Sequence, residues 1–211
     1  MPQRRSPLRT RVLSGAAALV LMAGLSACAA EDEPVDEPVV IPTEAPELEP
    51  EPTPEPEPSV FAMPTTCTDI FPQSRLDNLA GQGLELLGGP GSPEGNDAFF
   101  DPTPEQLVGG ISCIWADPDG NIADLLVSVA PLSASTRSGV VNDLTAQGLN
   151  EGSGDDGVIT FAQLGDEQGA PAIYNEIANQ SWISVISAFG GQVFYDEAVE
   201  FAAEIRGEVY E

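Results

Sequence analysis

Five segments in the C-terminal half of the chain are rich in apolar residues, and in 122–129 these recur at every second position, at Ala123, Leu125, Val127 and Val129. This period is typical of β-strands, in which successive side chains point to opposite faces. Turn-forming residues separate the segments, such as Asn179 and Gln180 before the last one. That last segment is apolar on both faces, which favours a central strand covered on both sides. The predicted strands are 111–115, 122–129, 158–164, 171–177 and 181–189.

Hydrophobic residues recur every three or four positions in three other segments, as expected for helices that bury one side. The predicted helices cover 69–81, 133–147 and the chain from 196 onward, and Ser133 or Ser135 is the expected N-cap of the second. A single helical turn is expected where Thr103 precedes Pro104 and Glu105. The last helix has the clearest apolar stripe, formed by Ala198, Phe201, Ala202, Ile205 and Val209.

The order of these elements is α, β, β, α, β, β, β, α. It predicts an α+β fold, in which a mostly antiparallel sheet of about five strands is packed by two to three helices. In the first two strands Cys113, Trp115 and Val127 occupy positions expected to point inward, whereas Ser128 lies on the opposite face. We expect one such domain at residues 60–211.

Polar or glycine-rich segments between these elements are expected to be loops. Residues 88–97 are rich in glycine and proline, but a phosphate-binding loop would need a Lys-Ser/Thr ending and a preceding strand. Residues 116–121 read Ala-Asp-Pro-Asp-Gly-Asn, which favours a hairpin turn. A calcium loop would need a third acidic ligand at the expected spacing and a glutamate at its twelfth position. Residues 150–157 are expected to form a polar loop.

The first 28 residues have the organisation of an export signal. A basic segment, 1–11, precedes an uncharged apolar segment, 12–27, which is shorter than the roughly 20 residues of a membrane-spanning helix. The sequence Leu25-Ser26-Ala27-Cys28 resembles the lipobox of bacterial lipoproteins. The resemblance implies a signal peptide at 1–27, cleavage between Ala27 and Cys28, and diacylglycerol and palmitate on Cys28. An ordinary signal peptide with a chance cysteine, or an uncleaved anchor, is the alternative, and the export route stays open.

Glutamate and proline alternate through much of residues 28–59. Such a segment has too few apolar side chains to form a core, and proline together with like charges favours an extended chain. We expect a disordered stalk that separates the domain from the membrane. A proline-rich recognition motif is the alternative, although no aromatic or basic residue interrupts the repeats.

The charged residues exclude several classes of function. The net charge is −27, the chain contains neither lysine nor histidine, and four of its seven arginines lie within residues 1–11. Such a chain repels nucleic acid and has no basic patch for anionic lipids, so membrane attachment would depend on the lipid at Cys28. Ser-His-Asp triads, histidine zinc sites and Schiff bases are excluded as well. No catalytic residue, metal or cofactor is therefore predicted, and a carboxylate pair is the catalytic chemistry left open.

Two cysteines remain once Cys28 is assigned to the lipid anchor. Exported proteins with an even number of cysteines usually form disulfides, so we expect a Cys67–Cys113 bridge between the first helix and the sheet. A redox-active pair is the alternative, but the chain has no Cys-x-x-Cys spacing.

A second resemblance covers most of the predicted domain. A cysteine before a short helix, a Cys-x-Trp strand, a hairpin, Leu164-Gly165-Asp166 with Ala170 following, and a terminal helix resemble actinobacterial lipoprotein domains of unknown function. They are also similar to extracellular sensor domains of bacterial kinases. The resemblance implies an exported α+β domain and supplies no catalytic residue.

These patterns predict a non-catalytic binding or accessory module of the envelope, held at the extracytoplasmic face of the membrane. The amino-acid usage resembles that of a high-GC bacterium, which suggests a Gram-positive envelope. The expected partner is an envelope protein or a small ligand. A carboxylate-dependent hydrolase of cell-wall glycans and a purely structural acidic coat protein are the alternatives. Trp115 and Trp182 are candidates for ligand stacking, although core packing is the simpler interpretation.

Overall fold

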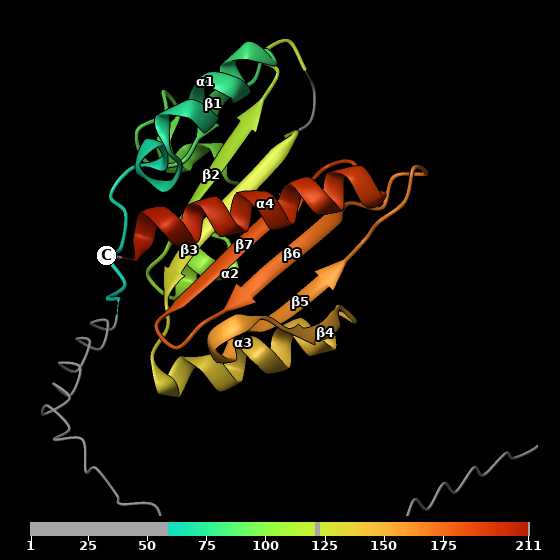
Figure 1. Cartoon of the computed structure of the whole chain (residues 1–211). Helices are drawn as coiled ribbons and strands as arrows, with labels where there is room; N and C mark the ends of the chain where they lie inside the picture. Colours follow the sequence, from blue (N-terminus) through green and yellow to red (C-terminus); the bar gives the residue numbers. More distant parts are fainter. Residues whose placement is uncertain (1–58, 121–122, 211) are drawn as a thin grey trace, which may run out of the picture. The chain divides into compact units, whose positions relative to one another are not determined.

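The computed structural model describes residues 59–120 and 123–210, which form one sheet with helices on both faces (Figure 1). Its strands are β1 (Glu85–Gly88), β2 (Ile111–Ala116), β3 (Leu125–Pro131), β4 (Asn150–Ser153), β5 (Ile159–Gln163), β6 (Ala172–Ile177) and β7 (Ser181–Ser187). Its helices are α1 (Gln73–Gly81), α2 (Pro104–Leu107), α3 (Ala134–Ala146) and α4 (Gln192–Val209). Three 3₁₀ turns complete the described part: η1 (Cys67–Ile70), η2 (Gly95–Ala98) and η3 (Asp155–Gly157).

The predicted α+β fold is confirmed, but the predicted number of strands is too low. The described residues form a seven-stranded antiparallel sheet with the order β1-β2-β3-β7-β6-β5-β4, so the doubly apolar strand β7 is central, as predicted. The two missed strands are the edges. β1 has four residues and ends in glycine, and all four residues of β4 are exposed. An edge strand with no buried face produces no alternation, which is why residues 150–153 were wrongly included in the loop expected at 150–157.

Two helix boundaries differ from the prediction for local reasons. The expected helix at 69–81 is split into η1 and α1, because Phe71 precedes Pro72 and takes an extended conformation with φ −128° and ψ 148°. The last helix begins at Gln192 rather than at 196, directly after Gly191 with φ 102°. Its first turn contains Val193, Phe194 and Tyr195, whose β-branched and aromatic side chains favour a strand in the sequence.

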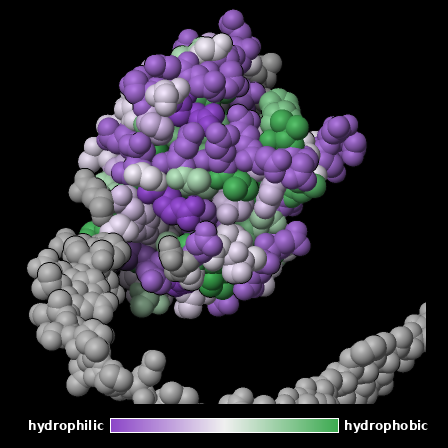
Figure 2. All heavy atoms as spheres, viewed as in Figure 1, coloured by the Kyte–Doolittle hydropathy of each residue, from purple (hydrophilic) through white to green (hydrophobic). Residues whose placement is uncertain are grey.

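The main core lies between the sheet and α4, on what we call the α4 face. The predicted pairing is confirmed, because Cys113 lies opposite Val127 and Trp115 lies opposite Leu125, and all four side chains are buried here. Figure 1 shows α4 crossing the strands on this face, and Figure 2 shows that its outer surface is mostly hydrophilic. The apolar stripe predicted for α4 is buried against the sheet: Ala198, Phe201, Ala202, Ile205 and Val209.

A second, smaller core lies on the opposite face, which we call the α3 face. Val140 and Leu144 of α3 pack there against Phe161 and Trp182 of the sheet. The short helix α2 covers the neighbouring part of this face, next to β2 and β3. The central strands are therefore buried on both sides, and Ser128 is buried although its face was not predicted to point inward.

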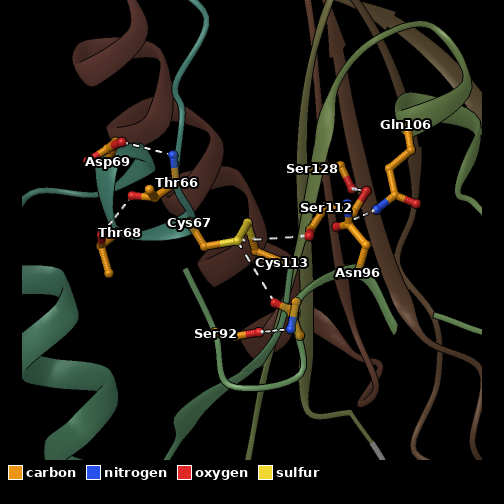
Figure 3. Close-up of a disulfide and its surroundings, with 12 residues drawn as sticks. Thr66, Cys67, Thr68, Asp69, Ser92, Asn96, Gln106, Ser112, Cys113 and Ser128 are labelled. Carbon is orange, nitrogen blue, oxygen red and sulfur yellow. Dashed lines mark hydrogen bonds between the residues drawn. A yellow bond between two sulfur atoms is a disulfide. The ribbon is translucent and has the colours of Figure 1, made fainter. Parts of the chain in front are cut away.

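The predicted Cys67–Cys113 disulfide is present and joins η1 to the middle of β2. Both cysteines are fully buried, and the Cys67 sulfur lies 3.9 Å from the backbone oxygens of Gly88 and Ser112 (Figure 3). The loop after β1 passes so close to the bridge that a methyl group at Gly89 would overlap the Ser112 oxygen. Gly89 also has φ 98°, a conformation that other residues rarely adopt. The disulfide and Gly89 together hold this loop against β2.

The two ends of the described unit pair with each other. Phe61 forms an antiparallel bridge with Tyr210, and the Ala62 amide donates to the Val209 oxygen at 2.8 Å. The rings of Phe61 and Tyr210 lie 5.6 Å apart. The chain thus enters the sheet region beside the end of α4.

Candidate functional site

A row of buried polar side chains crosses the α3 face of the sheet. Ser112 of β2 lies opposite Ser128 of β3, which lies opposite Ser184 of β7, which lies opposite Asn175 of β6. All four are less than 5% exposed. Buried polar groups are unfavourable unless they are satisfied, so such a row calls for partners on the helices that cover it.

Part of this polar row is satisfied by a chain of hydroxyl groups. The Ser128 hydroxyl donates to Ser112 Oγ at 2.7 Å, and Ser112 Oγ lies 2.6 Å from Thr103 Oγ1 at the start of α2. Figure 3 shows Ser112 and Ser128 together beside the disulfide strand. Thr103 is also the N-cap of α2 and accepts a bond from the Gln106 amide, so α2 is fixed over the polar row. The helical turn expected at this threonine is confirmed.

The other end of the polar row is satisfied by an indole. Trp182 Nε1 donates to Asn175 Oδ1 at 2.9 Å, and Asn175 Nδ2 donates to the Phe161 oxygen at 3.3 Å. Trp182 is 4% exposed and is therefore largely a core residue. The second tryptophan, Trp115, lies in the other core, where its ring packs edge-to-face with that of Phe71 and the ring centroids are 5.5 Å apart.

Glu105 of α2 is the one charged side chain brought to this face near the polar row within the described residues. It is 6% exposed, although it sits in the first turn of a four-residue helix. Burial raises the pKa of Glu105, and hydrogen bonds from its own backbone amide, Ser184 and Thr103 act against this to a smaller extent. All three opposing groups are neutral, so no counter-charge accompanies the carboxyl group.

A cavity of about 240 Å³ lies between α2, the end of α3 and the sheet. Its floor combines two members of the polar row, Ser184 and Asn175, with a neighbouring row of partly buried residues, Leu126, Ile173 and Ile186, which we call the aliphatic floor. Small-molecule sites typically combine an apolar lining with a few polar groups in this way. The described lining consists of Thr103, Pro104, Glu105, Leu126, Leu144, Gln147, Ile173, Asn175, Trp182, Ser184 and Ile186.

Further hollows lie elsewhere on the described unit, and two of them contain groups of interest. One of about 150 Å³ lies between α1 and the first turns of α4, where Asp124 and Glu197 line it together with Phe189, Phe194 and Phe201. Asp124 accepts a bond from the Asp117 amide at 2.9 Å, which closes the hairpin turn before β3. The other, of about 470 Å³, lies beside Ser59 and the end of α4 at the edge of the described residues.

The residues singled out from the sequence fall in three places. Cys67 and Cys113 form the disulfide of the main core, and the two tryptophans lie one in each core. Asp117 Oδ1 accepts a bond from the Asp119 amide at 2.9 Å, as expected for a turn. Ala27, Cys28 and the stalk lie outside the described residues. None of the described helices is both long enough and apolar enough to cross a bilayer.

The cavity residues were missed because each is ordinary in its local sequence. Glu105 follows Thr103 and Pro104 as an acid in a helical first turn, which is normally a solvated position. Ser184 and Asn175 lie in strands whose α3 face is buried only because α3 packs on it in the folded protein. The available signal was the central strand 181–189, which was predicted to be covered on both faces and contains Ser184 on one of them.

Comparisons of the chain with known protein families, curated proteins and solved structures gave no match. Within the described residues, no group of three Asp, Glu or Cys side chains is arranged to hold a metal ion.

Proposed function

We propose that this protein is a lipid-anchored binding module of a bacterial envelope, and that its ligand site is the cavity between α2, α3 and the sheet. The observation that supports the binding role is Glu105, a buried carboxyl group that lines a partly open cavity with a mixed polar and aliphatic lining. A buried ionisable group without a counter-charge is costly to stability, and such costs are typical of functional sites.

The cavity supports binding rather than hydrolysis. Glycosidases of both stereochemical types use two carboxyl groups that flank the scissile bond. Glu105 is the one carboxyl group among the described residues that line this cavity. The remaining polar groups there are hydroxyls, amides and an indole, which orient a ligand.

The binding role is tested by filling the cavity. Ile186→Trp adds an indole to the aliphatic floor, whereas Val193→Trp adds the same group to an exposed position, 75% accessible, on α4. Small molecules extracted from the purified full-length chain are measured by mass spectrometry. We expect one molecule to accompany the wild type and Val193→Trp and to be absent from Ile186→Trp. Identical extracts from all three proteins would contradict a ligand site at this position.

The anchor is supported by the lipobox resemblance at Leu25-Ser26-Ala27-Cys28 and by the acidic composition, which provides no basic patch for anionic lipids. Cells that express Cys28→Ala are grown with a fatty-acid label, and we expect no label on the protein. The matched control replaces Cys67 and Cys113 by alanine and leaves Cys28 in place, so it stays labelled. Label on Cys28→Ala at the wild-type level would refute the anchor.

A glycan hydrolase is the second candidate, and the hollow that contains Asp124 and Glu197 is what favours it. Two carboxylates lie there among three aromatic rings, which are common surfaces for sugar rings. Release of reducing sugars from purified cell walls by the full-length chain, and its loss in Glu197→Gln, would support this candidate. Equal release by both proteins would assign the activity to a contaminant.

A further inference from the structure

Within the part of the chain that the structure describes, the Glu105 carboxyl group has no cationic partner. The chain contains no lysine or histidine, and four of its seven arginines lie within residues 1–11, the predicted signal peptide. The other three are engaged elsewhere. Arg75 pairs with Glu204 at 2.7 Å and Arg206 pairs with Glu176 at 3.4 Å, both on the α4 face.

The third of these arginines also binds away from the cavity. Arg137 of α3 donates to the backbone oxygens of Ala178 at 2.6 Å and Ile177 at 3.2 Å, at the β6–β7 hairpin. It is absent from the cavity lining. Among the described residues the Glu105 carboxylate therefore lacks a counter-charge, which a cationic ligand would supply.

The neutral polar groups near Glu105 already form hydrogen bonds with other groups of the chain. Thr103 Oγ1 already bonds to Ser112, and Asn175 is engaged by Trp182 and Phe161. Glu105 is the one ionisable group in the described lining of the cavity, and it is 6% exposed. The polar end of the cavity thus presents a carboxyl group in a partly dehydrated setting, where a charge-assisted hydrogen bond is strongest.

The other end of the cavity requires an apolar group. Leu126, Ile173 and Ile186 form a partly buried aliphatic surface next to the polar row. Water above such a surface is released when an apolar ligand covers it. The volume of about 240 Å³ is below the usual range for drug-sized ligands, so the ligand is small.

We infer that this cavity binds a small organic cation, with an ammonium group against the Glu105 carboxylate and an aliphatic body on the aliphatic floor. This inference rests on the proposed binding function and names its ligand class. The net charge of −27 favours it further, because a strongly acidic protein raises the concentration of cations near its surface.

The test uses the two tryptophans as reporters. Trp182 lines the cavity, whereas Trp115 is buried on the other face of the sheet, so its indole signal is an internal control. The full-length chain, labelled with ¹⁵N-tryptophan and held in detergent, is titrated with n-butylammonium, 1-butanol and butanoate. We expect saturable movement of the Trp182 signal with n-butylammonium at a concentration at least about tenfold lower than with 1-butanol, and none with butanoate.

Two isosteric variants locate the selectivity. Glu105→Gln keeps the shape of the side chain, and we expect it to remove the preference for n-butylammonium over 1-butanol. Glu176→Gln is the matched control, because Glu176 is also buried but pairs with Arg206 on the other face, and it should keep the preference.

Three outcomes overturn the inference: equal affinity for n-butylammonium and 1-butanol, a preference that survives Glu105→Gln, or no movement of the Trp182 signal with any probe. If the neutral or anionic probe binds as well as the cation, the binding module stands and its ligand class is wrong. If a small molecule fails to accompany the purified wild type as well, both proposals fail.

Discussion

Reduction of the Cys67–Cys113 disulfide should lower the free energy of unfolding by about 4 kcal/mol. The two cysteines are separated by 46 positions, and the chain-entropy model gives this value for a loop of that length. The loss is a large fraction of the 5–15 kcal/mol that stabilises a typical domain. We nevertheless expect the reduced protein to remain folded, because the cores on both faces of the sheet do not depend on the bridge for their other contacts.

The assay is urea unfolding followed by tryptophan fluorescence, on a form that begins at residue 29 and so carries no lipid. Oxidised and reduced samples of the same protein are compared, since replacing both cysteines would also remove buried sulfur atoms from the core. The slope of the free energy against urea should increase on reduction, because the unfolded chain without the loop exposes more surface. A change in unfolding free energy below about 1 kcal/mol would refute the entropic account of this bridge.

Three further predictions concern individual residues. Gly89→Ala should destabilise the protein by about 1–3 kcal/mol through crowding and its positive φ, whereas Gly139→Ala, in open space within α3, should be neutral or stabilise it by up to about 1 kcal/mol in urea unfolding. Arg75→Ala should lower the free energy of unfolding by about 1–2 kcal/mol. A double-mutant cycle with Glu204→Ala should show that the Arg75–Glu204 pair accounts for part of this loss, and strictly additive losses would contradict a direct interaction. Burial raises the pKa of Glu105 above its ordinary value of 4.5, so the folded state binds the carboxyl proton more tightly than the unfolded state does. Protonated Glu105 therefore favours the folded state at low pH, and this stabilisation is lost as the pH rises through the pKa of the folded state. Glu105→Gln should therefore be more stable than the wild type at pH 7 and equal to it below about pH 4 by thermal unfolding, and a constant difference would count against this account.

The pattern of apolar residues was sufficient to predict most of the sheet, because β2 and β3 place inward apolar side chains at every second residue and β7 is apolar on both faces. Residues 181–189 were correctly expected to be central, and Cys113 and Val127 were correctly placed on one inner face. The edge strand β4 was missed since its exposed residues have no such period. The boundaries near Pro72 and Gly191 depend on single backbone conformations rather than on periodicity.

The candidate site was much harder to predict, because it is created by packing between distant segments. Glu105 becomes buried only when α2 lies across β2 and β3, and Ser184 becomes a cavity wall only when α3 covers half of its face. Short polar side chains in strands are read as solvent-facing, as Ser128 was. The disulfide was easier, since an even number of cysteines in an exported chain carries its own prediction.

The position of Cys67 has a mechanical consequence for a chain held from its N-terminal side. A pull on residue 59 first separates the bridge between Phe61 and Tyr210, including the hydrogen bond from the Ala62 amide to the Val209 oxygen. At Cys67 the load passes through a covalent bond into the middle of β2. A pull from the N-terminal side can therefore separate only residues 59–66 before the force reaches β2 through the disulfide.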